Sequence, residues 1–533
     1  MHNIMPLGYQ AMVTSPHHTA SAVGSAILQQ GGNAFDAAVA VSAVLGVVYP
    51  HMTGLGGDSF FLLYPAHEHR VIGYNGSGRA GRNASQAHYE DRGLTTIPDR
   101  GMASVLTVPG MVDAWWNVWS RYGKLPWKQL LEPAIQYAEQ GFPITRNLHY
   151  WMMKDETLLR ADAGLLAICT NAEGRLLEEG ERLIQPQLAE TLRLIADGGR
   201  DVLYTGSIAL SLAHSVQQAG GLLTEEDFAE HRGEWVQPIS TRYRGADVYQ
   251  MPPNSQGFSV LMMLNILEHK KLHEVSRHSA EFYHLAAEAV KAAFRYRDRY
   301  LSDPAFVQIP VGELISKPLG AALFKEPSFH AYQAGAFESM AMGQDTAYAA
   351  VVDQEGNAVS FIQSLYYDFG SGCTAGDTGI ILQNRGSFFS LQPGHPNALM
   401  PGKRSFHTLM PGMVLRGGKP CLLAGTQGGE GQPQTTLSLL TGVLDYGCNI
   451  QEAIALPRWV YGRTWGEDSD TLKLENRALD PGAAGQLQSW GHQVELLPAW
   501  SSAVGQAQGI QISPDGVLGG AADPRGDGLA IGW

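Results

Sequence analysis

The chain alternates between segments with a helical spacing of apolar residues and shorter segments with the alternation of a strand. In residues 279–300, Phe282 and Leu285 belong to a set of apolar side chains that recur every three or four positions, which places them on one helix face. Residues 60–64 and 70–74 are predicted to be paired strands. Helices are predicted over residues 19–30, 34–48, 112–122, 127–140, 187–198 and 279–300.

Strand patterns dominate after residue 345. Residues 346–353 and 358–364 are predicted to form a hairpin around the turn at residues 354–357. Further hairpins are predicted within residues 413–423 and 510–517. Since strand-rich and helix-rich segments follow one another without a linker or a low-complexity tract, we expect one α+β unit. In this unit two stacked sheets lie between helical layers.

Composition and charge exclude several classes of protein. The 533 residues are 44% hydrophobic, enough to bury large cores, and the formal charge of −14 argues against binding to nucleic acid or to anionic membranes. The four cysteines form no CxxC pair, so neither a zinc site nor a disulfide framework is predicted. The first residues lack a signal-peptide pattern, and the first apolar run, residues 34–49, is too short to span a bilayer. We therefore expect a cytoplasmic protein.

Thr346 is the first candidate for chemistry, because it stands at the start of a predicted strand deep inside the chain. A threonine in such a place is usually only a good strand former. If the bond between Asp345 and Thr346 is cut, however, the threonine gains an α-amine with a pKa of about 7.7–8.0, roughly two units below that of a lysine. That amine can serve as the base for its own hydroxyl. Such a site needs no metal and no cofactor.

Two other segments supply what a threonine nucleophile needs. Ser364 lies on the paired strand, where its hydroxyl can steady a free amine. In the turn formed by residues 425–429, the backbone N–H groups of Gly428 and Gly429 can face an oxyanion. The chain has no GxSxG elbow, and the glycine turn has no Gly-Lys-Ser/Thr ending, so a serine hydrolase elbow and a phosphate loop are both disfavoured.

The order of motifs along the chain resembles that of the γ-glutamyltranspeptidase family of N-terminal-nucleophile amidohydrolases, over nearly all 533 residues. Each motif is weak alone, but their order is hard to obtain by chance. Besides the segment at Thr346, the motifs are Gly31-Gly32-Asn33-Ala34-Phe35-Asp36, Gly54-Leu55-Gly56-Gly57-Asp58, Thr107-Val108-Pro109-Gly110, Pro252-Pro253-Asn254-Ser255-Gln256-Gly257, Gly376-Asp377-Thr378-Gly379 and Ala522-Asp523-Pro524-Arg525.

The resemblance implies an αββα sandwich and self-cleavage between Asp345 and Thr346. Residues 1–345 would form a large, mostly helical fragment, and residues 346–533 a small, strand-rich fragment, together one intertwined unit. The two fragments would be each other's partners, and whether the heterodimers assemble further is left open. The implied activity is cleavage of a small-molecule amide through an acyl-enzyme, with water or an amine as acceptor.

The sequence departs from the family pattern where the γ-glutamyl group is recognised. The family's aspartate for the substrate α-amine aligns with Phe388, and its arginine for the carboxylate falls near Ser77, two residues before Arg79. Phe388 cannot accept a hydrogen bond from the α-ammonium group of a substrate. Burying that group without a partner costs on the order of several kcal/mol. The predicted substrate-binding residues are Arg79, Tyr366, Arg385, Phe388, His407 and Thr408.

Two classes of function therefore compete. The first is an autoprocessed amide-cleaving enzyme, acting either on γ-glutamyl donors or as an acylase for other groups such as glutaryl amides. The second is an unprocessed relative that uses the same fold only for binding. The retained Thr346, Ser364, Gly428 and Gly429 favour the enzyme.

Overall fold

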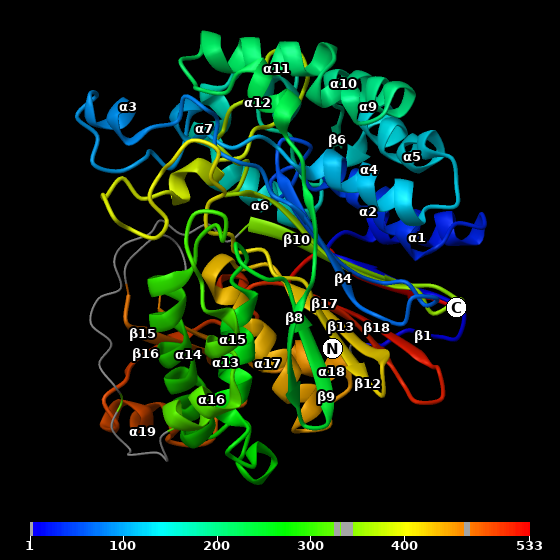
Figure 1. The fold of residues 1–533 in the computed structure, drawn as a ribbon. Coiled ribbons are helices and arrows are strands. Elements are labelled where there is room, and N and C mark those ends of the chain that lie inside the picture. The colour runs from blue at the N-terminus through cyan, green and yellow to red at the C-terminus, as the bar shows by residue number, and fades with distance from the viewer. Residues whose placement is uncertain (1–3, 325–330, 332–344, 463–468) are drawn as a thin grey trace.

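Two seven-stranded sheets face each other between two layers of helices (Figure 1). The computed structural model describes residues 4–324, 331, 345–462 and 469–533. The first sheet has the order β1 (Leu7–Gly8), β18 (Leu518–Ala522), β17 (Ala507–Ile512), β13 (Lys419–Thr426), β12 (Gly412–Arg416), β9 (Ala246–Gln250) and β8 (Ile239–Tyr243). The second has the order β19 (Leu529–Gly532), β2 (Met12–Ser15), β10 (Asp345–Val352), β11 (Ala358–Tyr366), β3 (Asp58–Tyr64), β4 (Ile72–Gly76) and β7 (Glu234–Val236).

Long helices cover the outer face of each sheet and confirm the predicted αββα fold. The predicted helices and hairpins are confirmed, with ends that differ by a few residues. The second sheet is covered by α1 (His18–Gln29), α2 (Ala34–Val48) and α4 (Met111–Tyr122), with α5 (Trp127–Gln140) and α9 (Pro186–Gly198) farther out. The first sheet is covered by α13 (Gly257–Leu267), α17 (Gln432–Leu444) and α18 (Ile450–Ala455), with α14 (Ala280–Tyr300) behind α13.

Shorter elements surround this sandwich. The remaining helices are α3 (Gln86–Glu90), α6 (Arg146–Lys154), α7 (Glu156–Ala161), α8 (Ala163–Cys169), α10 (Asp201–Tyr204), α11 (Ser207–Gln218), α12 (Glu225–Glu230), α15 (Val311–Leu314), α16 (Lys317–Leu323) and α19 (Ala483–Ser489). A small sheet of β14 (Trp459–Tyr461), β15 (Thr471–Glu475) and β16 (Gln493–Leu497) lies beside α14 and α19, and β5 (Phe142–Pro143) pairs with β6 (Arg182–Leu183). In the part of the chain that the structure describes, no helix combines the length and apolarity needed to cross a membrane.

The alanine-rich sequence of α2 is explained by its central position. Asn33 and Asp36 form a capping box at its N-terminus, and all of its residues are buried. Small side chains allow α2 to pack closely on β10, β11 and α5 at once. Between the two sheets, a separate apolar core includes Phe60, Tyr348 and Leu423.

Both sheets combine strands from the two sides of position 346. In the second sheet, β10 and β11 lie between β2 and β3, and in the first, β12 lies beside β9. A cut before Thr346 would therefore leave two fragments that share both sheets. This interleaving supplies a physical reason why they would stay together.

Candidate active site

Thr346 is the second residue of β10, in the middle of the second sheet, and its side chain is buried. The register between β10 and β11 shifts here: Asp345 pairs with Tyr366 and Ala347 with Gln363. Thr346 therefore lies opposite Ser364 and the residue after it. The local irregularity separates the start of β10 from the regular ladder that follows.

The structure brings the predicted oxyanion loop to Thr346. Nε2 of Gln432, the first residue of α17, lies 3.4 Å from the hydroxyl oxygen of Thr346. Gly428 caps the 3₁₀ turn Gly429–Gly431 that leads into that helix, and Gly428 and Gly429 have φ angles of 130° and 53° that favour glycine. Their N–H groups lie at a helix N-terminus, which attracts negative charge. Gln256 donates to the carbonyl oxygen of Gly429 at 3.0 Å and holds the loop from the other side.

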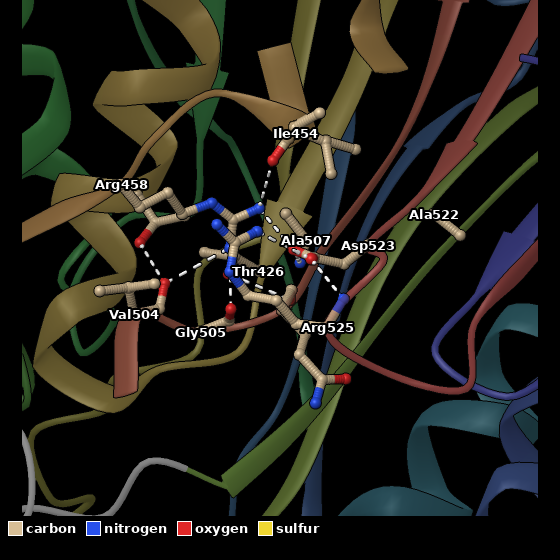
Figure 2. A network of polar contacts seen from close by, with 12 residues as sticks. Thr426, Ile454, Arg458, Val504, Gly505, Ala507, Ala522, Asp523 and Arg525 are labelled. Atoms are coloured by element: carbon tan, nitrogen blue, oxygen red, sulfur yellow. Dashed lines mark hydrogen bonds and ion pairs between the residues drawn. The ribbon is translucent and has the colours of Figure 1, made fainter. Parts of the chain in front are cut away.

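Arg458, Asp523 and Arg525 form a buried network of charges (Figure 2). Arg458 and Arg525 both bind Asp523, and Arg458 also donates to the carbonyl oxygen of Gly505 at 2.8 Å. The segment that contains Gly505 runs against the loop, because the N–H of Gln427 donates to the carbonyl oxygen of the next residue, Gln506, at 3.0 Å. Arg525 is fixed further by a buried ion pair with Glu475. The motif around Asp523 thus positions the backbone that carries Gly428.

Ser364 makes a local contact that shapes the next residues. Its hydroxyl oxygen accepts a hydrogen bond from the N–H of Tyr366 at 2.7 Å. Tyr366 has a φ of 87°, a conformation that is strained for a residue with a side chain. Strain of this kind persists where the surrounding structure fixes the conformation, and here the Tyr366 ring packs against Phe388 and Arg385.

Arg385 and three aromatic rings form a buried cluster. Arg385 and Phe388 lie on one 3₁₀ turn, Arg385–Phe388, and the Arg385 guanidinium carbon lies 4.2 Å from the centre of the Tyr366 ring. The Phe388 ring is 4.5 Å from the Tyr366 ring and 4.7 Å from that of Phe406. No hydrogen-bond partner for any guanidinium nitrogen of Arg385 occurs among the described residues. Burial lowers the pKa of Arg385 to about 10, so it remains protonated at pH 7.

His407 lies near this arginine but is held by the protein. Its Nδ1 accepts from the N–H of Leu409 at 3.3 Å, so Nε2 carries the proton and donates to Asp58 at 3.2 Å. Burial, and then the charge of Arg385, lower the pKa of His407 to about 3, so the ring is neutral at pH 7. Both ring nitrogens of His407 therefore already form hydrogen bonds with other groups of the protein. The geometry therefore favours Arg385 over His407 as a donor to substrate.

The other two predicted recognition residues have different surroundings. Arg79 pairs with Glu234 at 2.7 Å and with Asp303 at 3.1 Å, so two carboxylates already neutralise it. Thr408 is buried, and its carbonyl oxygen accepts from Gln256 at 2.9 Å. Their roles in binding substrate stay predictions.

Sequence reasoning missed several polar residues at the site. Asp58 is fully buried and accepts hydrogen bonds from the N–H groups of Gly78 and Gly110 as well as from His407. Glu430, next to the glycine loop, forms a buried ion pair with Arg297 at 2.6 Å. The motifs around Asp58 were visible in the sequence, but only the fold shows that they converge.

Two facing sheets between two layers of helices are the architecture of N-terminal-nucleophile hydrolases. The family model described as gamma-glutamyltranspeptidase matches residues 20–533, and the chain belongs to this family. It is accordingly an enzyme of the amidohydrolase and acyltransferase type.

Similar proteins carry several activities in their names. The chain is 51% identical to the glutathione hydrolase-like YwrD proenzyme of Bacillus subtilis, with 99% of each chain covered. It is 39% identical to the oxamate amidohydrolase proenzyme of Klebsiella pneumoniae, with 98% of each covered. The protein is also similar to a cephalosporin acylase from Bacillus halodurans whose crystal structure is known. The two sequences are 35% identical, and the structures superpose with a TM-score of 0.91, covering 100% of this chain and 97% of the acylase chain. The word proenzyme in the first two names indicates processing of one precursor into two fragments.

Replacing Gly429 with valine should lower kcat by about 10²–10³, the usual effect of losing one oxyanion donor. A β-branched residue does not tolerate a φ of 53°, so the loop must shift its N–H group. The strain itself costs about 1–3 kcal/mol, which a stable domain survives. The measurement is kcat of the processed protein on an acyl p-nitroanilide.

Gly417→Val is the matched control for this substitution. Gly417 has a φ of 59° in the exposed turn between β12 and β13, where an added Cβ atom would meet only open space. It should carry the same backbone strain without the catalytic loss. Equal activity of the Gly429 and Gly417 variants would place the oxyanion donors elsewhere.

Proposed function

We propose that this enzyme uses Thr346 as an N-terminal nucleophile to cleave amides whose acyl group carries a carboxylate but no α-amine. The observation that carries the proposal is Arg385, a buried guanidinium with no hydrogen-bond partner among the described residues. A buried cation without an acceptor is costly, whereas a carboxylate can engage a guanidinium through two parallel hydrogen bonds. A carboxylate on the substrate would remove that cost.

Tyr366 connects Arg385 with the strand that carries Thr346. The Tyr366 ring contacts the Arg385 guanidinium, and Tyr366 pairs with Asp345 across the strands, one residue from Thr346. In this proposal the carboxylate of a short acyl chain lies at Arg385 and its amide at Thr346. Phe388, beside them, offers an ammonium group no acceptor, which disfavours a γ-glutamyl donor.

Self-cleavage prepares the nucleophile in this proposal. The hydroxyl oxygen of Thr346 attacks the carbonyl carbon of Asp345, and the peptide bond is exchanged for an ester. Water then hydrolyses the ester, which leaves a carboxylate on residue 345 and a free α-amine on Thr346. Asp345 and Thr346 are thus the proposed cleavage site.

Turnover repeats the same chemistry on the substrate amide. The neutral α-amine takes the proton of the Thr346 hydroxyl, whose oxygen attacks the amide carbon. The N–H groups of Gly428 and Gly429 stabilise the oxyanion, and the departing amine receives the proton. The resulting ester is released by water or by an acceptor amine. The protein supplies the nucleophile, the base and the oxyanion donors in these steps.

The names of the relatives agree with a recognition site that varies within the family. Oxamate, in the name of the Klebsiella pneumoniae relative, is an amide with a carboxylate and no α-amine. The names of other relatives specify glutathione hydrolase or acylase. They support a common amide-cleaving centre with different acyl groups.

The test compares kcat/KM for glutaryl and γ-glutamyl p-nitroanilide, which share a leaving group and differ only in the α-amine. We expect glutaryl to be preferred by about tenfold or more, since each charge-assisted contact contributes about 1.5–3 kcal/mol. An uncharged pentanoyl anilide serves as the reference for chain length. A tenfold preference for the γ-glutamyl compound would instead restore ordinary γ-glutamyl transfer or hydrolysis as the function.

A further inference from the structure

Two histidines and a glutamate gather at a point that the proposed catalysis does not use. His284 and Glu288 are one turn apart on α14, and His492 lies between α19 and β16. One potential ligand atom from each of the three lies within 4.8 Å of the other two. Nδ1 of His284 and Nε2 of His492 are 2.8 Å apart.

The protein holds the two imidazoles in fixed positions. His284 and His492 are 2% and 5% exposed, and the ring of Trp490 packs at 5.4 Å from that of His284. The side chain of Glu288 is 27% exposed, so the cluster is closed on the histidine side and open to solvent on the carboxylate side. An ion could therefore enter past Glu288 without unfolding of the core.

We propose that His284, Glu288 and His492 form a binding site for a divalent transition-metal ion, with zinc as the preferred ion. Two imidazoles and one carboxylate, with an i,i+4 pair on one helix, are a common ligand set for zinc, and a water molecule can fill a fourth position. In the metal-free protein the N–H of one imidazole donates a hydrogen bond to the other ring. On metal binding that proton moves to the far nitrogen of the same ring, so both rings ligate as neutral groups.

Lys291 is the group that opposes this site. Its ammonium lies 2.8 Å from Oε1 of Glu288, and its side chain is nearly buried. The lysine charge repels a divalent ion. Zinc affinity should therefore rise when Lys291 is replaced by glutamine, an outcome that a purely structural His284–His492 pair does not produce.

The site would join the two fragments of the proposed processed enzyme. His284 and Glu288 belong to residues 1–345 and His492 to residues 346–533. A bound ion would then add a bond across the fragment interface, far along the chain from Thr346. This consequence rests on the proposed cleavage, whereas the metal site itself does not.

The experiment begins with full-length protein stripped by a chelator and dialysed. Zinc is titrated by calorimetry, and cobalt(II) is titrated by visible absorption, which reports a tetrahedral site directly. We expect one tight site per chain, weakened at least about 100-fold by His492→Ala and by Glu288→Gln, because loss of even supporting groups costs about 10–100-fold. His273→Ala, at an exposed histidine, should bind as the wild type does.

Two outcomes would overturn the proposal. The first is no stoichiometric uptake of zinc or cobalt by the wild type. The second is uptake that His492→Ala, Glu288→Gln and Lys291→Gln leave unchanged, which would assign the ion to another place. Because Glu288 lies on the solvent side of the cluster, its variant is expected to fold even if His492→Ala does not. Activity on an acyl anilide is measured separately and is not expected to need the metal.

Discussion

Thr346→Ala should yield a single full-length chain that is folded and inactive. Without the Oγ atom no ester can form at residue 345, and no nucleophile is available for substrate. Loss of a catalytic nucleophile costs about 10⁶ in kcat. A denaturing gel and activity on an acyl anilide give the two readouts, and circular dichroism reports the fold.

Two further variants sharpen this test. Thr346→Ser keeps a hydroxyl and should still be processed, more slowly, while Thr96→Ala changes an exposed threonine and should behave as the wild type. N-terminal sequencing of the small wild-type fragment should begin at Thr346. A fragment that begins at any other residue would refute the proposed cleavage site.

Arg385→Met should lower kcat/KM for glutaryl p-nitroanilide by about 10–10², because a charge-assisted contact contributes about 1.5–3 kcal/mol. Activity on the uncharged pentanoyl anilide should change by only a few-fold. The free energy of unfolding should stay equal or rise by about 1–4 kcal/mol, since replacing buried charge by an apolar group of similar volume is often stabilising. If the variant loses its preference for glutaryl over pentanoyl anilide but is as stable as the wild type or more stable, Arg385 binds ligand and does not stabilise the fold.

Arg416→Met is the matched control, because Arg416 is exposed at the end of β12. It should alter neither selectivity nor stability. Arg385→Lys keeps a charge but not the planar fork, and should recover only part of the preference for glutaryl. An equal loss on glutaryl and pentanoyl substrates would mean that Arg385 supports the loop instead of binding the carboxylate.

The sequence was sufficient for the six predicted helices, the predicted hairpins and the layered architecture, but it did not mark α13 or α17, which cover the first sheet. Periodicity located α2, α14 and the β10–β11 hairpin because each buries a continuous apolar face. The position of Thr346 at a strand start also followed from this pattern. The predicted cytoplasmic location stays a prediction.

Side-chain contacts between segments far apart in the chain could not be predicted from the sequence. Arg79 and Arg385 look alike as candidates, yet Arg79 meets Asp303, which is 224 positions away, and Arg385 meets aromatic rings. The two environments decide whether a guanidinium is neutralised by the protein. Such pairings depend on the packing of the whole sandwich, which local spacing does not encode.

Trp533 lies beside the N-terminal segment, and this contact has a consequence for the design of the gene. The carbonyl oxygen of Trp533 accepts hydrogen bonds from the N–H groups of Tyr9 and Gln10 at 2.9 and 2.8 Å. A linker could therefore join Trp533 to the N-terminal segment that contains Tyr9, and the reading frame could be opened before Thr346. Such a circular permutant would carry threonine at its N-terminus once the initiator methionine is removed. Mutations that block self-cleavage could then be studied for their effect on turnover alone.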